Sequence, residues 1–205
     1  MQESNIELLF PTPVMFNQLD RKFTKEELIF VDKHSKKTNK NVGNVTSNNN
    51  YILNEPEFAD LKKIITVHLN EYLKKIVKPV YKTEVYVTQS WLNYTNKGEF
   101  HHKHEHPNSY LSGCLYIQTD ETKDKITFHK SGYQQIQIPT ENYDMMNSDS
   151  WWFNVKSGKI IIFPSSLTHH VDNVIADDTR ISIAFNSFIK GILGDNKSLT
   201  ELINE

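Results

Sequence analysis

The second half of this chain consists of short segments rich in β-branched and aromatic residues, separated by polar turns. No apolar pattern with helical spacing runs across these turns. This texture is typical of an all-β sandwich or barrel. The predicted strands are residues 85–94, 111–117, 125–129, 134–138, 151–155, 159–163 and 180–188. We therefore predict a mainly β fold with flanking helices.

Helical signals concentrate in the first 80 residues. Thr24 and Glu27 have the spacing of a capping box, which predicts a helix from there to about His34. A second helix is predicted to begin near Pro56, because proline suits a first helical turn. Its apolar residues recur at helical spacing up to Lys78, which a second proline follows.

The remaining segments complete the prediction of one domain. Residues 6–10 precede two prolines and are predicted to form a short strand, and the polar residues 38–50 are predicted to form a loop. A cap pattern at residues 198–201 predicts one short helix. The predicted domain spans residues 1–205, with a helical third (1–80) packed on a β-barrel core (81–190) and a short tail (191–205).

Composition predicts a soluble protein without a nucleic-acid or membrane partner. The chain has 205 residues, of which 38% are apolar, so it can bury a full core. A formal charge of -2 gives no electrostatic reason to expect nucleic acid or an anionic membrane. The single cysteine, Cys114, excludes an intrachain disulfide and fits a reducing compartment. Lysine, asparagine and isoleucine are abundant, as in AT-rich genomes, so we expect the cytoplasm of a bacterium or of a phage host.

Residues 101–106 contain four of the nine histidines in the chain. Imidazole is the commonest metal-binding side chain, and neutral histidine suits iron, zinc, copper and nickel. In an extended strand alternate residues share a face, so His102, His104 and His106 would point the same way. Two of them could then bind one ion together with a residue from elsewhere. The alternative is a solvated polar loop that is merely rich in histidine.

A second histidine pair, His169 and His170, follows a strand of apolar residues and a turn that contains proline. Arg180 begins the next strand, and alternation places Arg180, Ser182 and Ala184 on one face. An arginine inside a barrel needs an anionic partner, and its planar fork suits a carboxylate. Arg180 therefore binds either a ligand, which the neighbouring histidines favour, or a nearby aspartate. The candidate aspartates are Asp172, Asp177 and Asp178.

Residues 104–117 read His-Glu-His-Pro-Asn-Ser-Tyr-Leu-Ser-Gly-Cys-Leu-Tyr-Ile. This run, with His169 and Arg180 after it, resembles the iron(II)/2-oxoglutarate-dependent oxygenases. It is most similar to a bacterial and phage branch with a His-x-His-Pro-x-Ser motif, and more distantly to the prolyl hydroxylases. The resemblance implies a double-stranded β-helix, which is a cupin-like jelly roll. It also implies Fe(II), 2-oxoglutarate and O2 as cofactor and cosubstrates.

The resemblance implies a metal site in which His104 is the first ligand and His169 the distal one. Most of the superfamily has Asp or Glu two residues after the first histidine, which gives a set of two histidines and one carboxylate. Here His106 occupies that position. Glu105 could replace it only in a kinked strand, because alternation turns it away. His102 is interpreted as a supporting neighbour or an alternative ligand. The histidines interpreted as non-ligands are His101, His129 and His170.

The resemblance also implies a pocket for 2-oxoglutarate. Arg180 matches the basic residue that binds the far carboxylate of this cosubstrate. Tyr116 and Tyr94 match positions whose hydroxyls line the pocket in members similar to prolyl hydroxylases. The other predicted wall residues are Val171, Asn93 and Phe128.

The predicted activity is hydroxylation of a small molecule or a protein side chain, with release of succinate and CO2. One alternative is a three-histidine zinc enzyme, in which the metal activates water. The other is a non-catalytic, cupin-like metal-binding protein. Neither alternative requires Arg180 and the tyrosines together. Residues 145–153 are interpreted either as a substrate-facing loop or as a cap on the barrel, and the sequence allows a homodimer.

Overall fold

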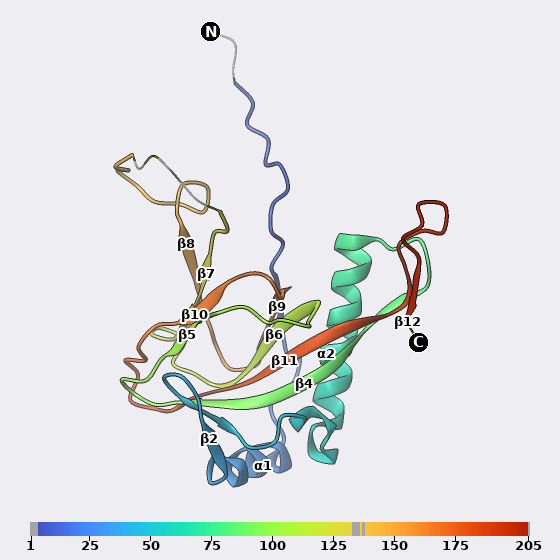
Figure 1. Cartoon of the computed structure of the whole chain (residues 1–205). Coiled ribbons are helices and arrows are strands. Elements are labelled where there is room, and N and C mark those ends of the chain that lie inside the picture. The colour runs from blue at the N-terminus through green and yellow to red at the C-terminus, as the bar shows by residue number, and fades with distance from the viewer. Residues whose placement is uncertain (1–3, 133–135, 137, 205) are drawn as a thin grey trace.

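The computed structural model describes residues 4–132, 136 and 138–204, and within these ranges the strands form two antiparallel sheets (Figure 1). The strands of the major sheet are β1 (Met15–Gln18), β2 (Thr38–Lys40), β3 (Val45–Ser47), β4 (Thr83–Thr95), β6 (Leu111–Gln118), β9 (Lys159–Pro164), β11 (Arg180–Leu193) and β12 (Leu202–Asn204). The strands of the minor sheet are β5 (His101–His104), β7 (Lys125–His129), β8 (Ser150–Asn154) and β10 (His169–Val171).

From β4 onward the chain passes repeatedly between the two sheets, so strand partners are distant in the sequence. The major sheet has the order β1-β9-β6-β11-β4-β3-β2, with β12 also paired to β11. The minor sheet has the order β5-β10-β7-β8. The predicted mainly β fold of the double-stranded β-helix type is confirmed.

Two helices precede β4. The first, α1 (Lys25–Ser35), begins at the predicted capping box. The backbone N–H of Glu27 donates to the Thr24 hydroxyl at 3.1 Å, and the Thr24 N–H donates to the Glu27 carboxylate at 2.7 Å. The second, α2 (Ala59–Tyr72), follows Pro56 as predicted. Short helical turns flank it at Ile52–Asn54, Pro56–Phe58 and Leu73–Val77. In the ranges described, no helix is both long and apolar enough to cross a membrane.

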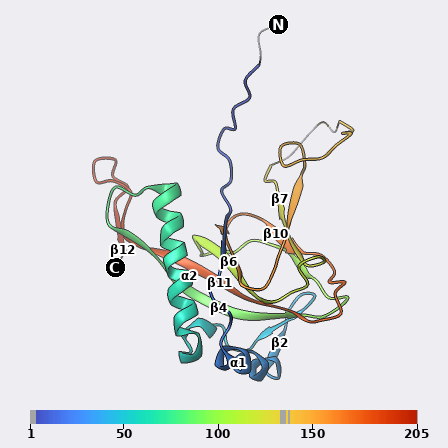
Figure 2. The same cartoon turned by 180° about the vertical axis from the view of Figure 1, so that it is seen from behind.

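The helix α2 packs against one face of the major sheet (Figure 2). Its buried residues Leu61, Ile65 and Leu69 lie at helical spacing and form one apolar stripe. Full burial of each such side chain contributes about 1.5–3 kcal/mol. The strand residues in the same core cluster include Leu92, Leu115, Ile160 and Ile183.

The strand β9 is buried on both faces, which accounts for its unbroken apolar run. Ile160 and Ile162 belong to the core under α2. Ile161 and Phe163 belong to a second core between the two sheets, which also contains Tyr116. The molecule therefore has two apolar layers, and the second borders the predicted site.

Three local predictions are wrong, because pairing partners elsewhere in the fold decided these segments. Residues 6–10 form no strand, and β1, which pairs with β9, lies a few residues later. The predicted loop 38–50 contains the hairpin β2–β3, which extends the major sheet beyond β4. The predicted helix at 198–201 is a turn, and β12 follows it and pairs with β11. The predicted strand 134–138 lies largely outside the described residues.

Gly113, in the middle of β6, has no room for a side chain. A methyl group there would lie 2.4 Å from the carbonyl oxygen of Ile161 and 2.4 Å from the Phe185 ring. Because both are buried, we expect Gly113→Ala to lower the free energy of unfolding by about 1–3 kcal/mol, measured by urea denaturation. The exposed control Lys156→Ala should change it by less than about 0.5 kcal/mol. Equal stability of Gly113→Ala and the parent protein would contradict this packing.

Candidate functional site

Three histidines from two neighbouring strands meet between the sheets. His104 ends β5, His106 follows two residues later, and His169 begins β10. These strands are antiparallel, and His104 is paired directly with His169. One ring nitrogen from each of the three histidines lies within 4.8 Å of the other two. The Nε2 atoms of His106 and His169 are 3.3 Å apart. The fold therefore brings together the three histidines that the sequence singles out as ligands.

Backbone carbonyls orient two of these rings. Nδ1 of His104 lies 2.7 Å from the carbonyl oxygen of His102, and Nδ1 of His169 lies 2.9 Å from that of Leu167. A carbonyl oxygen only accepts, so Nδ1 carries the proton and donates in both cases. In each of these two rings Nε2 then carries the lone pair that can bind a metal ion. His106 is held through its backbone N–H, which donates to the Ser165 carbonyl at 3.0 Å.

Burial keeps the three histidines neutral. Desolvation, with a smaller effect of His104, lowers the pKa of His106 to about 4. Desolvation also lowers the pKa of His104 and holds that of His169 well below its usual value. Neutral imidazole is the form that binds a metal, so these side chains can do so near neutral pH without first losing protons.

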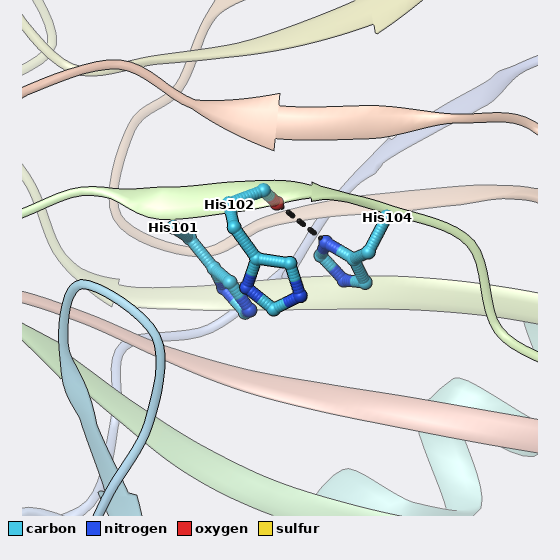
Figure 3. Close-up of side chains that lie close together, drawn as sticks. All are labelled: His101, His102 and His104. Carbon is cyan, nitrogen blue, oxygen red and sulfur yellow. Dashed lines mark hydrogen bonds between the residues drawn. The ribbon is translucent and has the colours of Figure 1, made fainter.

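His101 and His102 lie beside His104 on the same side of β5 (Figure 3). Between the positions paired across the two strands, β10 has one residue, His170, whereas β5 has two. This β-bulge re-aims the side chains and interrupts simple alternation. One ring nitrogen from each of His101, His102 and His104 again lies within 4.8 Å of the others. His101, interpreted from the sequence as a non-ligand, therefore lines the site as well.

A narrow cavity of about 20 Å³ lies next to the three histidines and is lined by both sheets. Arg180, Ser182 and Ala184 all line it from β11, as strand alternation predicts. The other predicted wall residues that line it are Asn93 from β4, Tyr116 from β6 and Val171 from β10. Most of the predicted cosubstrate residues therefore face one space that the histidines border.

Three buried polar atoms in this cavity have no hydrogen-bond partner among the described residues. They are Nε of Arg180, the hydroxyl of Tyr116 and Oδ1 of Asn93. Arg180 is only 3% exposed, and its guanidinium lies 5.1 Å from the centroid of the Tyr116 ring. An unsatisfied buried polar group costs about 1–3 kcal/mol, so three in one cavity indicate a polar ligand.

Within the described ranges, no carboxylate lies within ion-pair distance of Arg180. Asp172 instead pairs with Lys125 at 3.4 Å and lies 2.9 Å from His170. Asp177 pairs with Lys97 at 2.6 Å. The salt-bridge alternative for Arg180 is therefore wrong, and a buried cation without a protein anion faces the cavity.

Tyr94 does not line the cavity, contrary to its predicted role. Its hydroxyl donates to the Val31 carbonyl in α1 at 2.7 Å, and its ring belongs to the core under the helices. Adjacent strand residues face opposite sides, so Asn93 and Tyr94 cannot both face the cavity. Phe128 also belongs to an apolar core, the one between the sheets, with its ring centroid 6.1 Å from that of His169.

Three further side chains that line the cavity, and the backbone of Gly113, were absent from the prediction. Trp91 lies two positions before Asn93, and Cys114 two positions before Tyr116, so alternation along each strand could have found both. The Trp91 and His106 ring centroids are 5.9 Å apart. Burial raises the pKa of the Cys114 thiol to about 11. Ile126 comes from the minor sheet and has no comparable signal in the sequence.

The remaining candidate ligands have other partners. Glu105 is exposed and accepts a hydrogen bond from the hydroxyl of Thr168. Nε2 of His129 is 2.8 Å from Nδ1 of His170, whose Nε2 lies 2.9 Å from Asp172. His170 nevertheless reaches the cavity wall. The structure thus provides no carboxylate beside the three histidines in the part of the chain that it describes.

Comparison with known proteins finds one family model and several solved structures that are similar to this chain. Residues 89–186 match the family model described as "Putative 2OG-Fe(II) oxygenase". The fold is similar to that of HygX from Streptomyces hygroscopicus with nickel, 2-oxoglutarate and hygromycin B bound, at 14% identity and a TM-score of 0.57, over 86% of this chain and 82% of that one. A sequence search among curated proteins found no match.

Two further solved structures have the same fold. A prolyl-4-hydroxylase from Pseudomonas putida is 11% identical, with a TM-score of 0.55 over 85% of this chain and 92% of that one. The non-heme alpha ketoglutarate dependent epimerase SnoN from nogalamycin biosynthesis is 10% identical, with a TM-score of 0.57 over 86% of this chain and 78% of that one. At these identities the likeness establishes the fold.

Buried neutral histidines make the stability of the metal-free protein depend on pH. A histidine in an unfolded chain titrates near pH 6.5, whereas burial lowers the pKa of His106 to about 4 and that of His101 to about 3. Between about pH 6.5 and 4 the unfolded state binds more protons, so the free energy of unfolding should fall as pH decreases. Each histidine adds at most about 1.4 kcal/mol per pH unit, measured by urea denaturation at several pH values. An unchanged slope in His106→Gln would contradict this assignment.

Proposed function

We propose that this chain is an Fe(II)- and 2-oxoglutarate-dependent dioxygenase, because residues 89–186 match the model of a 2OG-Fe(II) oxygenase family. We further propose that it hydroxylates its substrate and releases succinate and CO2. One observation carries the proposal: a set of three neutral histidines borders a cavity in which a buried arginine has no protein anion.

His104, His106 and His169 would hold the iron through ring nitrogens that face one another. Their donor set suits Fe(II), since neutral imidazole is a good ligand for this ion. Iron bound there supplies the oxidative decarboxylation of 2-oxoglutarate by O2, with one oxygen atom going to succinate and the other to the substrate. The protein's part is to orient the reactants and keep water away.

Arg180 would bind the far carboxylate of 2-oxoglutarate. Its guanidinium can make two parallel hydrogen bonds to a carboxylate, and the ligand's charge would compensate the buried cation. The hydroxyl of Tyr116, which has no partner among the described residues, would donate to the same end of the ligand. Asn93 adds a polar contact from the neighbouring strand.

The absence of a carboxylate ligand changes the charge of the site. With three neutral ligands, a bound divalent ion leaves one more positive charge than with two histidines and a carboxylate. A dianionic ligand would then be attracted both by Arg180 and by this additional positive charge at the metal. We expect metal and 2-oxoglutarate to bind cooperatively here, because each supplies charge that the other lacks.

The two rival functions explain less of the cavity. A three-histidine zinc enzyme needs an open metal position but no buried arginine. A metal-binding scaffold needs no anion pocket. Neither function supplies a binding partner for the unpaired atoms of Arg180 and Tyr116. Both remain outcomes of the experiment below.

The test is succinate production by protein loaded with Fe(II) under anaerobic conditions and then given 2-oxoglutarate and O2. We expect succinate from the iron-loaded protein and none from the zinc-loaded protein or from His169→Ala. Calorimetry on the nickel-loaded protein measures 2-oxoglutarate binding independently of turnover. Metal binding without either 2-oxoglutarate binding or succinate would leave the zinc enzyme or the scaffold.

Arg180→Ala should separate the two halves of the site. Loss of a charge-assisted contact of about 1.5–3 kcal/mol predicts about 10- to 150-fold weaker binding of 2-oxoglutarate, measured by calorimetry. The affinity for Ni(II) without 2-oxoglutarate should change by less than about threefold, because Arg180 is not a ligand. Arg180→Lys keeps the charge without the fork and should fall in between. Equal loss of both affinities would contradict the assigned role.

A matched pair of tyrosine variants tests the position of each hydroxyl. Tyr116→Phe should weaken 2-oxoglutarate binding by about 5- to 10-fold, since it removes one hydrogen bond of about 1 kcal/mol. Tyr94→Phe should leave this affinity unchanged and instead lower the free energy of unfolding by about 1 kcal/mol, because its hydroxyl bonds to Val31. The reverse result would restore Tyr94 to the cosubstrate pocket.

A further inference from the structure

An open groove of about 310 Å³ adjoins the metal-binding histidines. His104, His106, His101 and Trp91 line both this groove and the narrow cavity. Arg180 and Tyr116 line the cavity alone. The histidines therefore stand between a narrow cavity that contains the Arg180 side chain and an open groove that a molecule from solvent can enter.

Strand β4 and the hairpin β2–β3 supply the rest of the groove wall. Gln89 and Trp91 continue the face of β4 that carries Asn93 in the cavity. Thr46 lies opposite Asn93 in the pairing of β3 with β4. The non-histidine residues that line the groove are Lys40, Asn41, Thr46, Asn50, Gln89 and Trp91.

The wall of the groove consists mainly of polar side chains. It presents three amides, one hydroxyl, one ammonium group and one indole ring, besides the histidines. Ligand sites are usually lined mainly by apolar side chains with a few polar groups. Here, among the described residues, the lining includes neither a carboxylate nor an aliphatic hydrocarbon side chain.

Most of these polar groups are free to bind a ligand. In the described part of the chain, the side chains of Thr46, Asn50 and Gln89 have no hydrogen-bond partner, and Lys40 has no ion pair. The neighbouring Asn49 behaves differently, since its side chain bonds to Glu55 at 2.7 Å and to the N–H of Tyr51 at 2.8 Å. Among the described amides that line the groove, only Asn41 is bonded in this way, since its Nδ2 donates to Oδ1 of Asn44 at 2.9 Å.

Trp91 provides a flat apolar surface next to the metal-binding residues. Its ring centroid is 5.9 Å from that of His106, with 33° between the planes. An indole face accepts the C–H side of a ring, and its N–H can donate a hydrogen bond. A ring placed on Trp91 would have its edge near the histidines and its polar groups near the amides.

We propose that this groove is the substrate site and that the substrate is a small polyhydroxylated ring molecule, a sugar or the sugar unit of a glycoside. The inference rests on the proposed function and names the substrate class of that site. A hydroxyl both donates and accepts, as an amide side chain does, so the free amides of Asn50 and Gln89 match several hydroxyls.

Other substrate classes fit this groove less well. A polyamine or a basic peptide would find no carboxylate to pair with its charges. An aliphatic or aromatic acid would leave the amides without hydrogen-bond partners. The volume is near the lower end of the range for small-molecule sites, which suits one or two rings rather than a long chain.

The test uses protein loaded with Ni(II), with and without 2-oxoglutarate, so that no turnover occurs. Saturation-transfer NMR is recorded with methyl glucoside, N-acetylglucosamine and maltose as probes. Spermidine, a proline-containing tripeptide and octanoate represent the other classes. We expect at least one sugar to give a signal with ring protons closest to the protein, and none of the other three to do so.

Two pairs of variants assign the signal to the groove. Gln89→Leu and Asn50→Leu, both at exposed positions, should each weaken the sugar's affinity about 5- to 10-fold, as expected for the loss of one hydrogen bond. The exposed Asn142→Leu is the control and should leave it unchanged. Trp91→Ala should abolish the signal, whereas Trp152→Ala, at an exposed ring outside the groove, should keep it.

Three results would overturn the proposal. They are signals from spermidine, the peptide or octanoate in place of the sugars, no signal from any probe, and a sugar signal that Gln89→Leu and Asn50→Leu leave intact. Binding of 2-oxoglutarate is measured separately. Sugar binding without 2-oxoglutarate binding would contradict the oxygenase function but support the groove as a sugar site. Binding of 2-oxoglutarate without sugar binding would support the oxygenase function but contradict the sugar site.

Discussion

The site depends on the pairing of two short strands, β5 and β10. The strand β5 has four residues and β10 has three, and their pairing places His104 directly opposite His169. The chain after β5 brings His106 next to these two histidines. The group His104, His106 and His169 needs both segments of the chain, whereas the second histidine group, His101, His102 and His104, lies on β5 alone. Backbone hydrogen bonds of the ladder and the carbonyls behind the rings hold the donors in place before any ion binds. The bulge in β5 follows from the same pairing and adds His101 and His102 to the lining.

A buried positive charge is the second constraint. Arg180 is held inside the jelly roll by β11, with β4 and β6 on either side. No described carboxylate lies within ion-pair distance of it, and Tyr116 and Asn93 contribute further unsatisfied atoms. Such a cavity is costly when empty and favourable when an anion fills it. If His106 takes the place of the usual carboxylate ligand, as proposed, a bound metal ion would leave additional positive charge for an anionic ligand to balance.

The two sides of the histidine cluster differ in chemistry, and this difference follows from which elements form them. The cavity side lies between the two sheets and contains the buried cation of Arg180. The open side is built by β4 and the hairpin β2–β3, where amides and an indole are free. Strand alternation links the sides, because Gln89, Trp91 and Asn93 form one row from groove to cavity. A ligand in the groove could therefore reach His104 and His106 without entering the cavity that contains Arg180.

Much of this protein could be predicted from its sequence, because the signals were local. The capping box at Thr24, the apolar stripe of α2 and the alternation that aims Arg180 and Ser182 inward depend on residues within one element. The family motif placed His104, His106, His169 and Tyr116. Tyr94 shows the limit, since its face was decided by the helix that covers the outer side of β4. The hairpin β2–β3 and the strands β1 and β12 were missed for the same reason, as a polar segment becomes a strand only when a distant edge offers hydrogen bonds. The sequence by itself therefore determined which residues could bind a metal and an anion, whereas long-range strand pairing alone decided which of them share one cavity and which groove opens beside them.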